Sequence, residues 1–97
     1  MSQTLTRALV TITGEIDIAT CEAMRDALTA GLGGGPVDLV ADLSGVTFMD
    51  ASGIGVLLGV RKQVMEAGGS FTLRAPSRAV RKVIGICGLD AVLPAIT

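Results

Sequence analysis

The stretch VDLVADLSGVTFMDASGIGVLLGV, residues 37–60, changes its apolar pattern halfway along. Its first part, residues 37–43, alternates apolar and acidic side chains, which is typical of a half-buried strand. Its second part has no polar side chain over residues 54–60 and continues at helical length until two glycines stop it. The stretch therefore predicts a strand, a loop leading to VTFM, and a helix over residues 53–67.

Strand-like and helix-like segments alternate on both sides of this stretch. Further strands are expected at residues 7–13, 70–75 and 92–96, and further helices at residues 21–32, with Thr20 as N-cap, and from Pro76-Ser77 to Gly88. Such alternation predicts an α/β domain with βαβ units and right-handed crossovers. We expect a single domain with a four- to five-stranded, mostly parallel sheet and helices mainly on one face. The TLT segment, residues 4–6, is a candidate for a short additional edge strand, and Pro94 places the last strand at an edge.

Periodicity also predicts which side chains face the core. In the first strand of the opening stretch these are Val37, Leu39 and Ala41, with Val40 among the acids on the other face. The helices should bury residues at i, i+3 and i+4 spacing: Ala23, Met24, Ala27, Leu28 and Leu32; then Ile54, Leu57, Leu58 and Met65; then Val80, Val83, Ile84 and Cys87. Cys21 and Cys87 fit no disulfide framework or metal spacing and are expected to be reduced and buried.

Composition narrows the class of function. The 97 residues suffice for one domain, and 49% are hydrophobic although only two are aromatic. The net charge of −1 divides unevenly, with two basic and seven acidic side chains in residues 1–50 against six and two in residues 51–97. This balance, without aromatics beside the basic residues, gives no support for direct nucleic-acid binding. No run of about 20 apolar residues and no signal-peptide pattern is present, so we expect no membrane insertion and a cytoplasmic protein.

Catalytic signatures are missing from the sequence. The chain has no histidine, which removes Ser-His-Asp and Cys-His nucleophile activation and every histidine-dependent metal site. Ser52 lies in DASGIG, which is not the G-x-S-x-G elbow, and the glycines match neither dinucleotide-binding nor P-loop patterns. Asp38 and Asp42 share a strand face and are interpreted as solvent-facing acids. We therefore expect no enzyme, no metal and no cofactor.

Ser52 is nevertheless placed where a partner could reach it. It is expected to be the N-cap of the apolar helix, in an exposed turn between an acid and Gly53. Gly53 and Gly55 would leave the backbone there uncovered. Because residues 54–60 are apolar in every direction, two readings stay open: a fully buried helix, or a helix that offers an apolar dock to another protein.

Three segments carry a family resemblance. DLSGVTFMDASGIGVLLGVRKQV, residues 42–64, closely resembles the signature of the STAS domain, in particular of the bacterial anti-sigma factor antagonists with their D-[SA]-S-G-[ILV]-G phosphorylation motif. GEIDIATCEAMRDAL, residues 14–28, and GLDAVLP, residues 88–94, resemble two further blocks of that family. On this resemblance, residues 1–97 are identified as one STAS domain. Position 51 departs from some members, which carry a second serine where this chain has Ala51.

The resemblance implies a partner switch. In that family the unphosphorylated antagonist binds an anti-sigma factor that is a GHKL-type serine kinase, which frees the sigma factor for transcription. The kinase phosphorylates the serine that matches Ser52, and a PP2C-type phosphatase restores it. The acid that matches Asp17 is expected beside the phosphorylation site. The partner-binding residues expected from the motif and its surroundings are Asp17, Asp50, Ala51, Gly53, Gly55 and Val56.

Two other readings stay open. The chain could be a STAS interaction subunit of another system, such as a lipid-transport ABC complex or a signalling scaffold. It could also be a small-ligand or nucleotide sensor, with Asp17 and residues 50–53 forming the pocket. The intact motif around Ser52 favours the antagonist.

Overall fold

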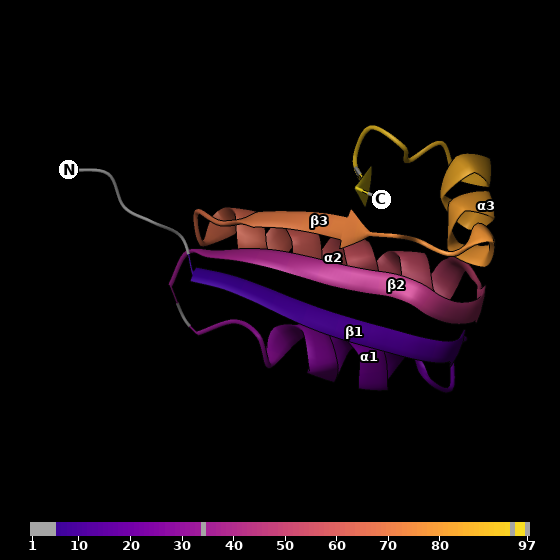
Figure 1. The fold of residues 1–97 in the computed structure, drawn as a ribbon, viewed down its shortest axis with the longest axis horizontal. Coiled ribbons are helices and arrows are strands. Elements are labelled where there is room, and N and C mark those ends of the chain that lie inside the picture. Colours follow the sequence, from indigo (N-terminus) through magenta and orange to yellow (C-terminus); the bar gives the residue numbers. More distant parts are fainter. Residues whose placement is uncertain (1–5, 34, 94, 97) are drawn as a thin grey trace.

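A computed structural model describes residues 6–33, 35–93 and 95–96 (Figure 1). Strands and helices alternate along the whole of this part. The elements are β1 (Thr6–Ile16), α1 (Cys21–Thr29), β2 (Val37–Met49), α2 (Ala51–Glu66), β3 (Ser70–Arg74), α3 (Arg78–Ile86) and β4 (Ala95–Ile96).

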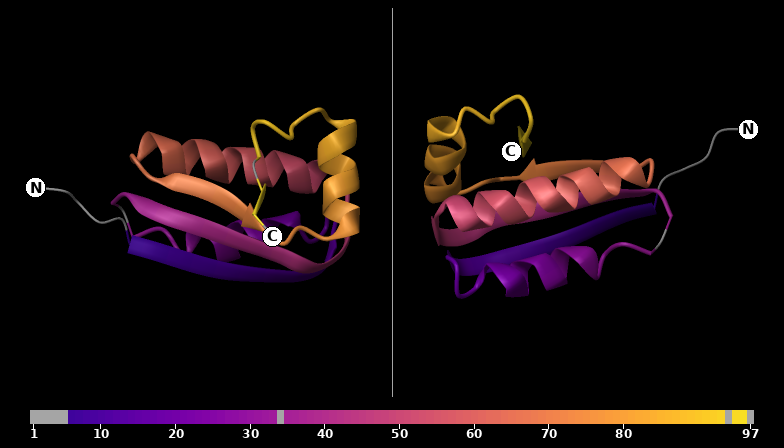
Figure 2. Two further views of the ribbon diagram at one scale, coloured as in Figure 1. Left: turned by 45° about the horizontal axis from the view of Figure 1, so that its top comes forward. Right: turned by 180° about the vertical axis from the view of Figure 1, so that it is seen from behind.

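The strands form one sheet in the order β1-β2-β3-β4, and every neighbouring pair is parallel. Helices α1 and α2 pack beside each other on one face, and α3 lies at the end of the sheet where β2 runs into α2 (Figure 2). The predicted α/β fold, with a parallel sheet and helices mainly on one face, is confirmed at four described strands. Strand β4 lies at the edge, as Pro94 predicted. Of the TLT segment only Thr6 lies within the described residues, and it begins β1.

Three strand predictions are wrong in extent. The strand predicted at residues 7–13 falls three residues short of the end of β1 at Ile16. The loop expected after residue 43 does not form, because β2 stays paired with β1 along thirteen residues. Two register shifts in the β1–β2 pairing accommodate this length, and Gly14 at the second shift has φ +88°. Strand β4 is two residues long, since the amides of Val92 and Leu93 both bond back to the carbonyl of Leu89 and form a turn.

The core follows the predicted faces in the sheet and only partly in the helices. Val37, Leu39 and Ala41 are buried as predicted, and so are Met24, Leu28, Ile54, Leu57, Val80 and Ile84. The prediction is wrong for Ala23, Ala27, Met65 and Cys87, which are exposed, while Leu32, Leu58 and Val83 are half-buried. In α2 the buried stripe is instead Gly53, Ile54, Val56, Leu57, Val60 and Val64. In each helix, therefore, only some of the apolar residues are buried, and the others remain partly or fully exposed.

The remaining expectations concern cysteines, acids and the membrane. Both cysteines are free, with Cys21 buried and Cys87 exposed. Asp38 and Asp42 do not simply face solvent, because both are half-buried. Asp38 pairs with Arg7 at 3.1 Å and accepts a bond from the Ser70 hydroxyl at 2.8 Å. Within the described residues, no helix has the length and apolar character needed to cross a membrane.

Candidate phosphorylation and partner-binding site

The carboxyl ends of β1 and β2 emerge side by side. Ile16 and Met49 are register partners, and the amide of Asp50 donates to the carbonyl of Ile16 at 3.2 Å. The loop that begins at Asp17 and the turn that begins at Asp50 are therefore held together by backbone pairing. The predicted neighbourhood of Asp17 and the Ser52 turn is thus built into the sheet.

The N-cap of α2 is Asp50 and not Ser52, which corrects the prediction. Asp50 has extended backbone angles, φ −109° and ψ −172°, and its carboxylate accepts from the Ser52 amide at 2.9 Å. Ser52 stands two residues later, inside the first helical turn. A carboxylate at the N-cap reaches the amide of the second helical residue, so the aspartate satisfies the amide group that would otherwise be free.

The Ser52 hydroxyl also donates to the carboxylate of Asp50. This bond is the largest cause that lowers the pKa of Asp50 below its ordinary value of 3.8. Burial, the second-largest cause, raises the pKa, and the amides of Ser52 and Gly53 lower it further. Asp50 is therefore ionised at neutral pH. Because the hydroxyl hydrogen points at Asp50, the lone pairs of the Ser52 oxygen face away from that carboxylate, and Ser52 is only half-buried. The lone pairs of the Ser52 oxygen, at the start of the helix, are thus free to accept a bond from a group other than Asp50.

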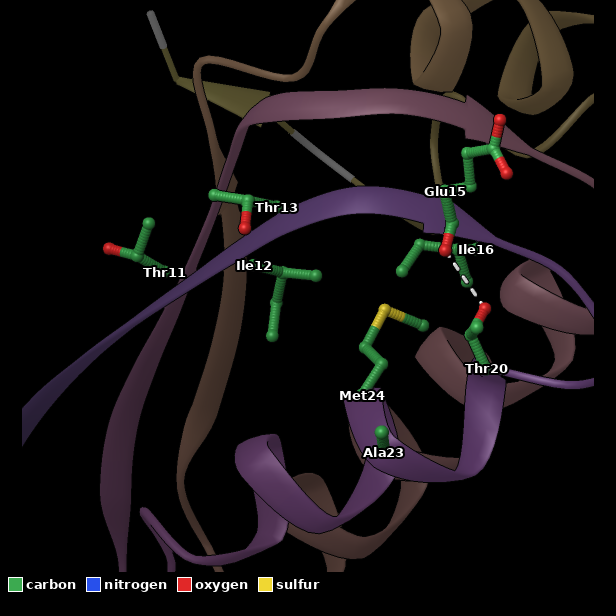
Figure 3. Close-up of a pocket in the computed structure, with 8 residues that line it drawn as sticks. All are labelled: Thr11, Ile12, Thr13, Glu15, Ile16, Thr20, Ala23 and Met24. Atoms are coloured by element: carbon green, nitrogen blue, oxygen red, sulfur yellow. Dashed lines mark hydrogen bonds between the residues drawn. The ribbon is translucent and has the colours of Figure 1, made fainter.

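Asp17 has a local structural role. Its carboxylate accepts from the amide of Ala19 at 2.9 Å and from the amide of Thr20 at 3.0 Å. Thr20 is the residue before α1, as predicted, but its hydroxyl makes no cap bond to the helix. That hydroxyl donates to the carbonyl of Glu15 at 2.8 Å instead (Figure 3). It also accepts from the Asp17 amide at 2.9 Å. Asp17 therefore shapes the loop that leads into α1, in addition to any contact that it makes outside the chain.

Two of the predicted partner-binding residues are buried. A Cβ atom added to Gly53 would lie 2.7 Å from Cγ of Met49 and 2.9 Å from Cγ2 of Ile16, so the glycine allows α2 to pack against both strand ends. Val56 is only 2% exposed and belongs to the core. Their predicted exposure to a partner is therefore wrong, because α2 turns this stripe toward the sheet.

The exposed surface of the site comes from other residues. Ala51 and Gly55 are exposed, and an added Cβ at Gly55 or at Gly59 would meet nothing within 4 Å. Ile18, which the sequence interpretation missed, is 82% exposed beside Asp17. No signal in the sequence marked it, because single exposed apolar side chains are common on protein surfaces.

A hollow of about 250 Å³ lies near the site, between β1 and α1 (Figure 3). Its inner side chains are Ile12, Ile16 and Met24, and its outer ones are Thr11, Thr13, Glu15, Thr20 and Ala23. Neither Asp17 nor residues 50–53 line it. The geometry of this hollow therefore gives no support to the pocket expected for a small-ligand sensor. No group of three or more metal-ligating side chains occurs in the part of the chain that the structure describes.

Comparison with known proteins agrees with this fold. A family model described as "Mlab, STAS domain" matches residues 1–94. The anti-sigma F factor antagonist of Lysinibacillus sphaericus is 34% identical over 82 residues, which cover 84% of this chain and 70% of that protein. The anti-sigma-B factor antagonist of Bacillus subtilis is 34% identical over 84 residues, which cover 87% of this chain and 76% of that protein.

Solved structures give the same result. The anti-sigma factor antagonist of Mycobacterium paratuberculosis superposes with a TM-score of 0.80 at 31% identity, covering 97% of this chain and 80% of that one. Unphosphorylated SpoIIAA gives 0.76 at 28% identity, covering 100% and 85%. Phosphorylated SpoIIAA from Bacillus gives 0.69 at 26% identity, covering 100% and 88%. The chain therefore belongs to the STAS domain family. Its curated relatives are anti-sigma factor antagonists, so it stands among regulatory binding proteins and not among enzymes.

Proposed function

We propose that this chain is an anti-sigma factor antagonist that phosphorylation at Ser52 switches off. In its unphosphorylated form it binds an anti-sigma factor that is a GHKL-type serine kinase, and the sigma factor is released. A PP2C-type phosphatase restores the binding form. The observation that carries the proposal is the Ser52 hydroxyl, half-exposed in the first turn of α2 and bonded to Asp50, in a chain whose relatives are antagonists.

A phosphate at this place is tolerated by the free protein. Ser52 lies at the positive end of the helix dipole of α2, which favours an anion. The amides of Ser52, Gly53 and Ile54 already donate to Asp50, so the dipole and solvent, and not these amides, accommodate the phosphate. The modified oxygen no longer donates to Asp50, and a group of about −1.5 to −2 charges then stands beside an ionised carboxylate. Water screens that repulsion in the free protein. The same charges would be desolvated in a complex, so the cost falls on binding.

The proposed contact surface combines the two neighbouring loops. Asp17 and Ile18 come from the loop after β1, and Ala51, Ser52 and Gly55 from the start of α2. Ile18 supplies the large exposed apolar side chain of this surface, and the small residues of α2 allow a partner backbone to approach. Cytoplasmic action follows from this proposal, since sigma factors act with the transcription machinery.

The test is phosphorylation by the cognate kinase and ATP, with the modified site located by mass spectrometry. The kinase is first isolated by its binding to Ser52→Ala. Wild-type protein should gain one phosphate, and Ser52→Ala should gain none. Ser44→Ala is a matched control, because the Ser44 hydroxyl also donates to an aspartate two residues earlier, Asp42, at 2.7 Å, but does so within a strand. Phosphate on Ser44, Ser70 or Ser77 would refute the assignment to Ser52.

A second candidate is a STAS interaction subunit of another system, such as a lipid-transport ABC complex. It is kept because the family model that matches residues 1–94 is described as Mlab and not as an antagonist. The same capture experiment separates the two candidates. Recovery of a membrane permease complex with Ser52→Ala, and of no kinase, would favour the subunit.

A further inference from the structure

Three basic side chains at the start of α3 stand together on the surface. Arg78, Arg81 and Lys82, at i, i+3 and i+4, line an open hollow of about 650 Å³ with Pro76. All three cations are exposed. We refer to Arg78, Arg81 and Lys82 as the basic surface of α3.

The charges of this surface are not neutralised within the described part of the chain. The two ion pairs found there join Arg7 to Asp38 and Arg25 to Glu22. The Nε group of Arg81 donates to the carbonyl of Pro76 at 3.1 Å. This bond fixes the guanidinium at the hollow while its Nη groups bond to no described residue, an arrangement suited to a carboxylate that accepts two parallel bonds.

The same cations oppose the local stability of α3. Positive charges are unfavourable at a helix N-terminus, where the dipole is positive. Arg78 is the first residue of the helix, its first turn contains no acid, and its last turn contains no base. Ser77 provides the N-cap by accepting from the Val80 amide, so the backbone needs no cation there. Basic residues at the N-terminal end of α3 lower the stability of the helix, and no contact in the described part of the chain compensates for this cost. Their placement therefore indicates a role in binding.

The basic surface adjoins the Ser52 end of the molecule. Helix α3 contacts both β2 and α2, and the Ser77 amide donates to the carbonyl of Leu43 at 3.3 Å. Figure 1 shows α3 at the end of the sheet where β2 finishes and α2 begins. A protein bound at Ser52 can therefore reach α3 without crossing the sheet.

The chemistry of the surroundings favours a short acidic protein segment as the occupant. An extended polyanion, such as nucleic acid or an anionic membrane, would also face the acids Asp17 and Asp50 at this end of the sheet, and no aromatic side chain lines the hollow to stack a base. A short segment avoids those acids. Ile86, 76% exposed one turn beyond Lys82, offers an apolar contact next to the cations.

We propose that the basic surface of α3 docks an acidic segment, ending in an apolar residue, of the protein that binds the Ser52 turn. The identity of that protein rests on the proposed function, whereas the surface itself can be tested without it. The interaction supplies electrostatic steering and a second point of attachment beside the phosphorylation switch.

The probe is a synthetic peptide of six glutamates followed by leucine, titrated into the ¹⁵N-labelled full chain. Shifts should be confined to residues 76–86, and raising the salt concentration should weaken them. Arg78→Glu/Lys82→Glu should bind about tenfold or more weakly, with an unchanged or higher melting temperature because the helix dipole favours the new acids. Arg61→Glu/Lys62→Glu, on α2, changes the net charge equally and should bind like wild type.

Equal losses in the two double variants would show a general charge effect and overturn the proposal, as would a titration without shifts on α3. Tighter binding of duplex DNA or of phosphatidylglycerol vesicles to the same residues would also overturn it, since the occupant would then be another class of molecule. If Arg78→Glu/Lys82→Glu does not fold, Arg81→Gln/Lys82→Gln is compared with Arg61→Gln/Lys62→Gln, which changes the net charge by the same amount. Kinase phosphorylation of Ser52 is measured separately, so failure of the switch and failure of this surface give different results.

Discussion

At the scale of single residues, the bond between Ser52, the proposed phosphorylation site, and Asp50 should be visible in the titration of Asp50. The hydroxyl is the largest cause of the lowered pKa of Asp50, so Ser52→Ala should raise that pKa toward 3.8. A lowered pKa means that Asp50 stabilises the fold fully above the unfolded-state value and loses this effect as the pH falls through the folded-state value. The variant should therefore lose less stability than wild type on acidification below about pH 4.

Carboxyl carbon shifts followed by NMR against pH measure this effect. Ser44→Ala is the control, because the Ser44 amide is the largest cause that lowers the pKa of Asp42 and the Ser44 hydroxyl is the second, and the variant removes only the hydroxyl. That variant should raise the pKa of Asp42 and leave Asp50 unchanged. An unaltered Asp50 titration in Ser52→Ala would mean that the hydroxyl points elsewhere in solution.

Asp17 should prove structural as well as functional. Asp17→Ala leaves the amides of Ala19 and Thr20 without their acceptor and should cost about 1 kcal/mol of stability. Asp17→Asn keeps an acceptor oxygen and removes the charge, so it should retain most of the stability while showing any effect of the charge on kinase binding. Thermal unfolding and phosphorylation rates measured on both variants separate the two roles. Equal melting temperatures for wild type and Asp17→Ala would remove the structural role.

At the scale of elements, the glycines of α2 should divide into two kinds. Gly53→Ala should cost roughly 1–3 kcal/mol, because the new methyl group meets Met49 and Ile16. Gly59→Ala should be neutral or stabilising by up to about 1 kcal/mol, since the position is open and alanine is the better helix former. Gly55→Ala should behave like Gly59→Ala in stability but weaken partner binding, given its place near Ser52.

Melting temperatures and kinase affinities of the three variants provide the measurement. Gly59→Leu extends the comparison, because a bulky side chain there blocks docking only if the partner covers this part of α2. A loss of stability in Gly55→Ala and Gly59→Ala would contradict the outward orientation of both residues.

β2 and α2 show which features of the helices and strands the sequence alone could predict. Alternation in residues 37–43 predicted the core face of β2, because a strand has only two faces. It did not predict that Val40, on the opposite face, is buried as well. The apolar run of α2 could not indicate its buried stripe, since residues at every angle were equally apolar. In the structure Gly53 packs against Met49 and Ile16, and Val56 is buried as well. The N-cap was misplaced because aspartate and serine are both good caps and stand two residues apart. Backbone angles decide between them.

At the scale of the whole molecule, phosphorylation should change binding without changing the fold. The phosphate lies at an exposed helix start, so circular dichroism of both forms should overlay. Affinity for the kinase should fall by about 2–5 kcal/mol, because the added charge is desolvated beside Asp50 at the interface. Ser52→Asp, with less charge, should reproduce only part of this loss. A helix signal that decreases on phosphorylation would indicate that the switch acts by melting α2.

The tertiary arrangement was predictable in outline, because alternating strands and helices joined by right-handed crossovers leave few topologies. The position of α3 was not, since its apolar residues specify a buried face but not the element that covers it. Its contacts with β2 and with α2 emerge only from the three-dimensional structure.

The strands of the sheet stand in the same order as they follow along the chain. No strand has to be inserted between two that are already paired, so each βα unit can add to the edge left by the one before it, and loop closures stay short. The longest pairing, between β1 and β2, is available before β3 has been synthesised. Since Ile16 and Met49 bring the Asp17 loop and the Ser52 turn together, the end of the molecule proposed to carry the switch can assemble early on the ribosome, with β3, α3 and β4 added to it afterwards.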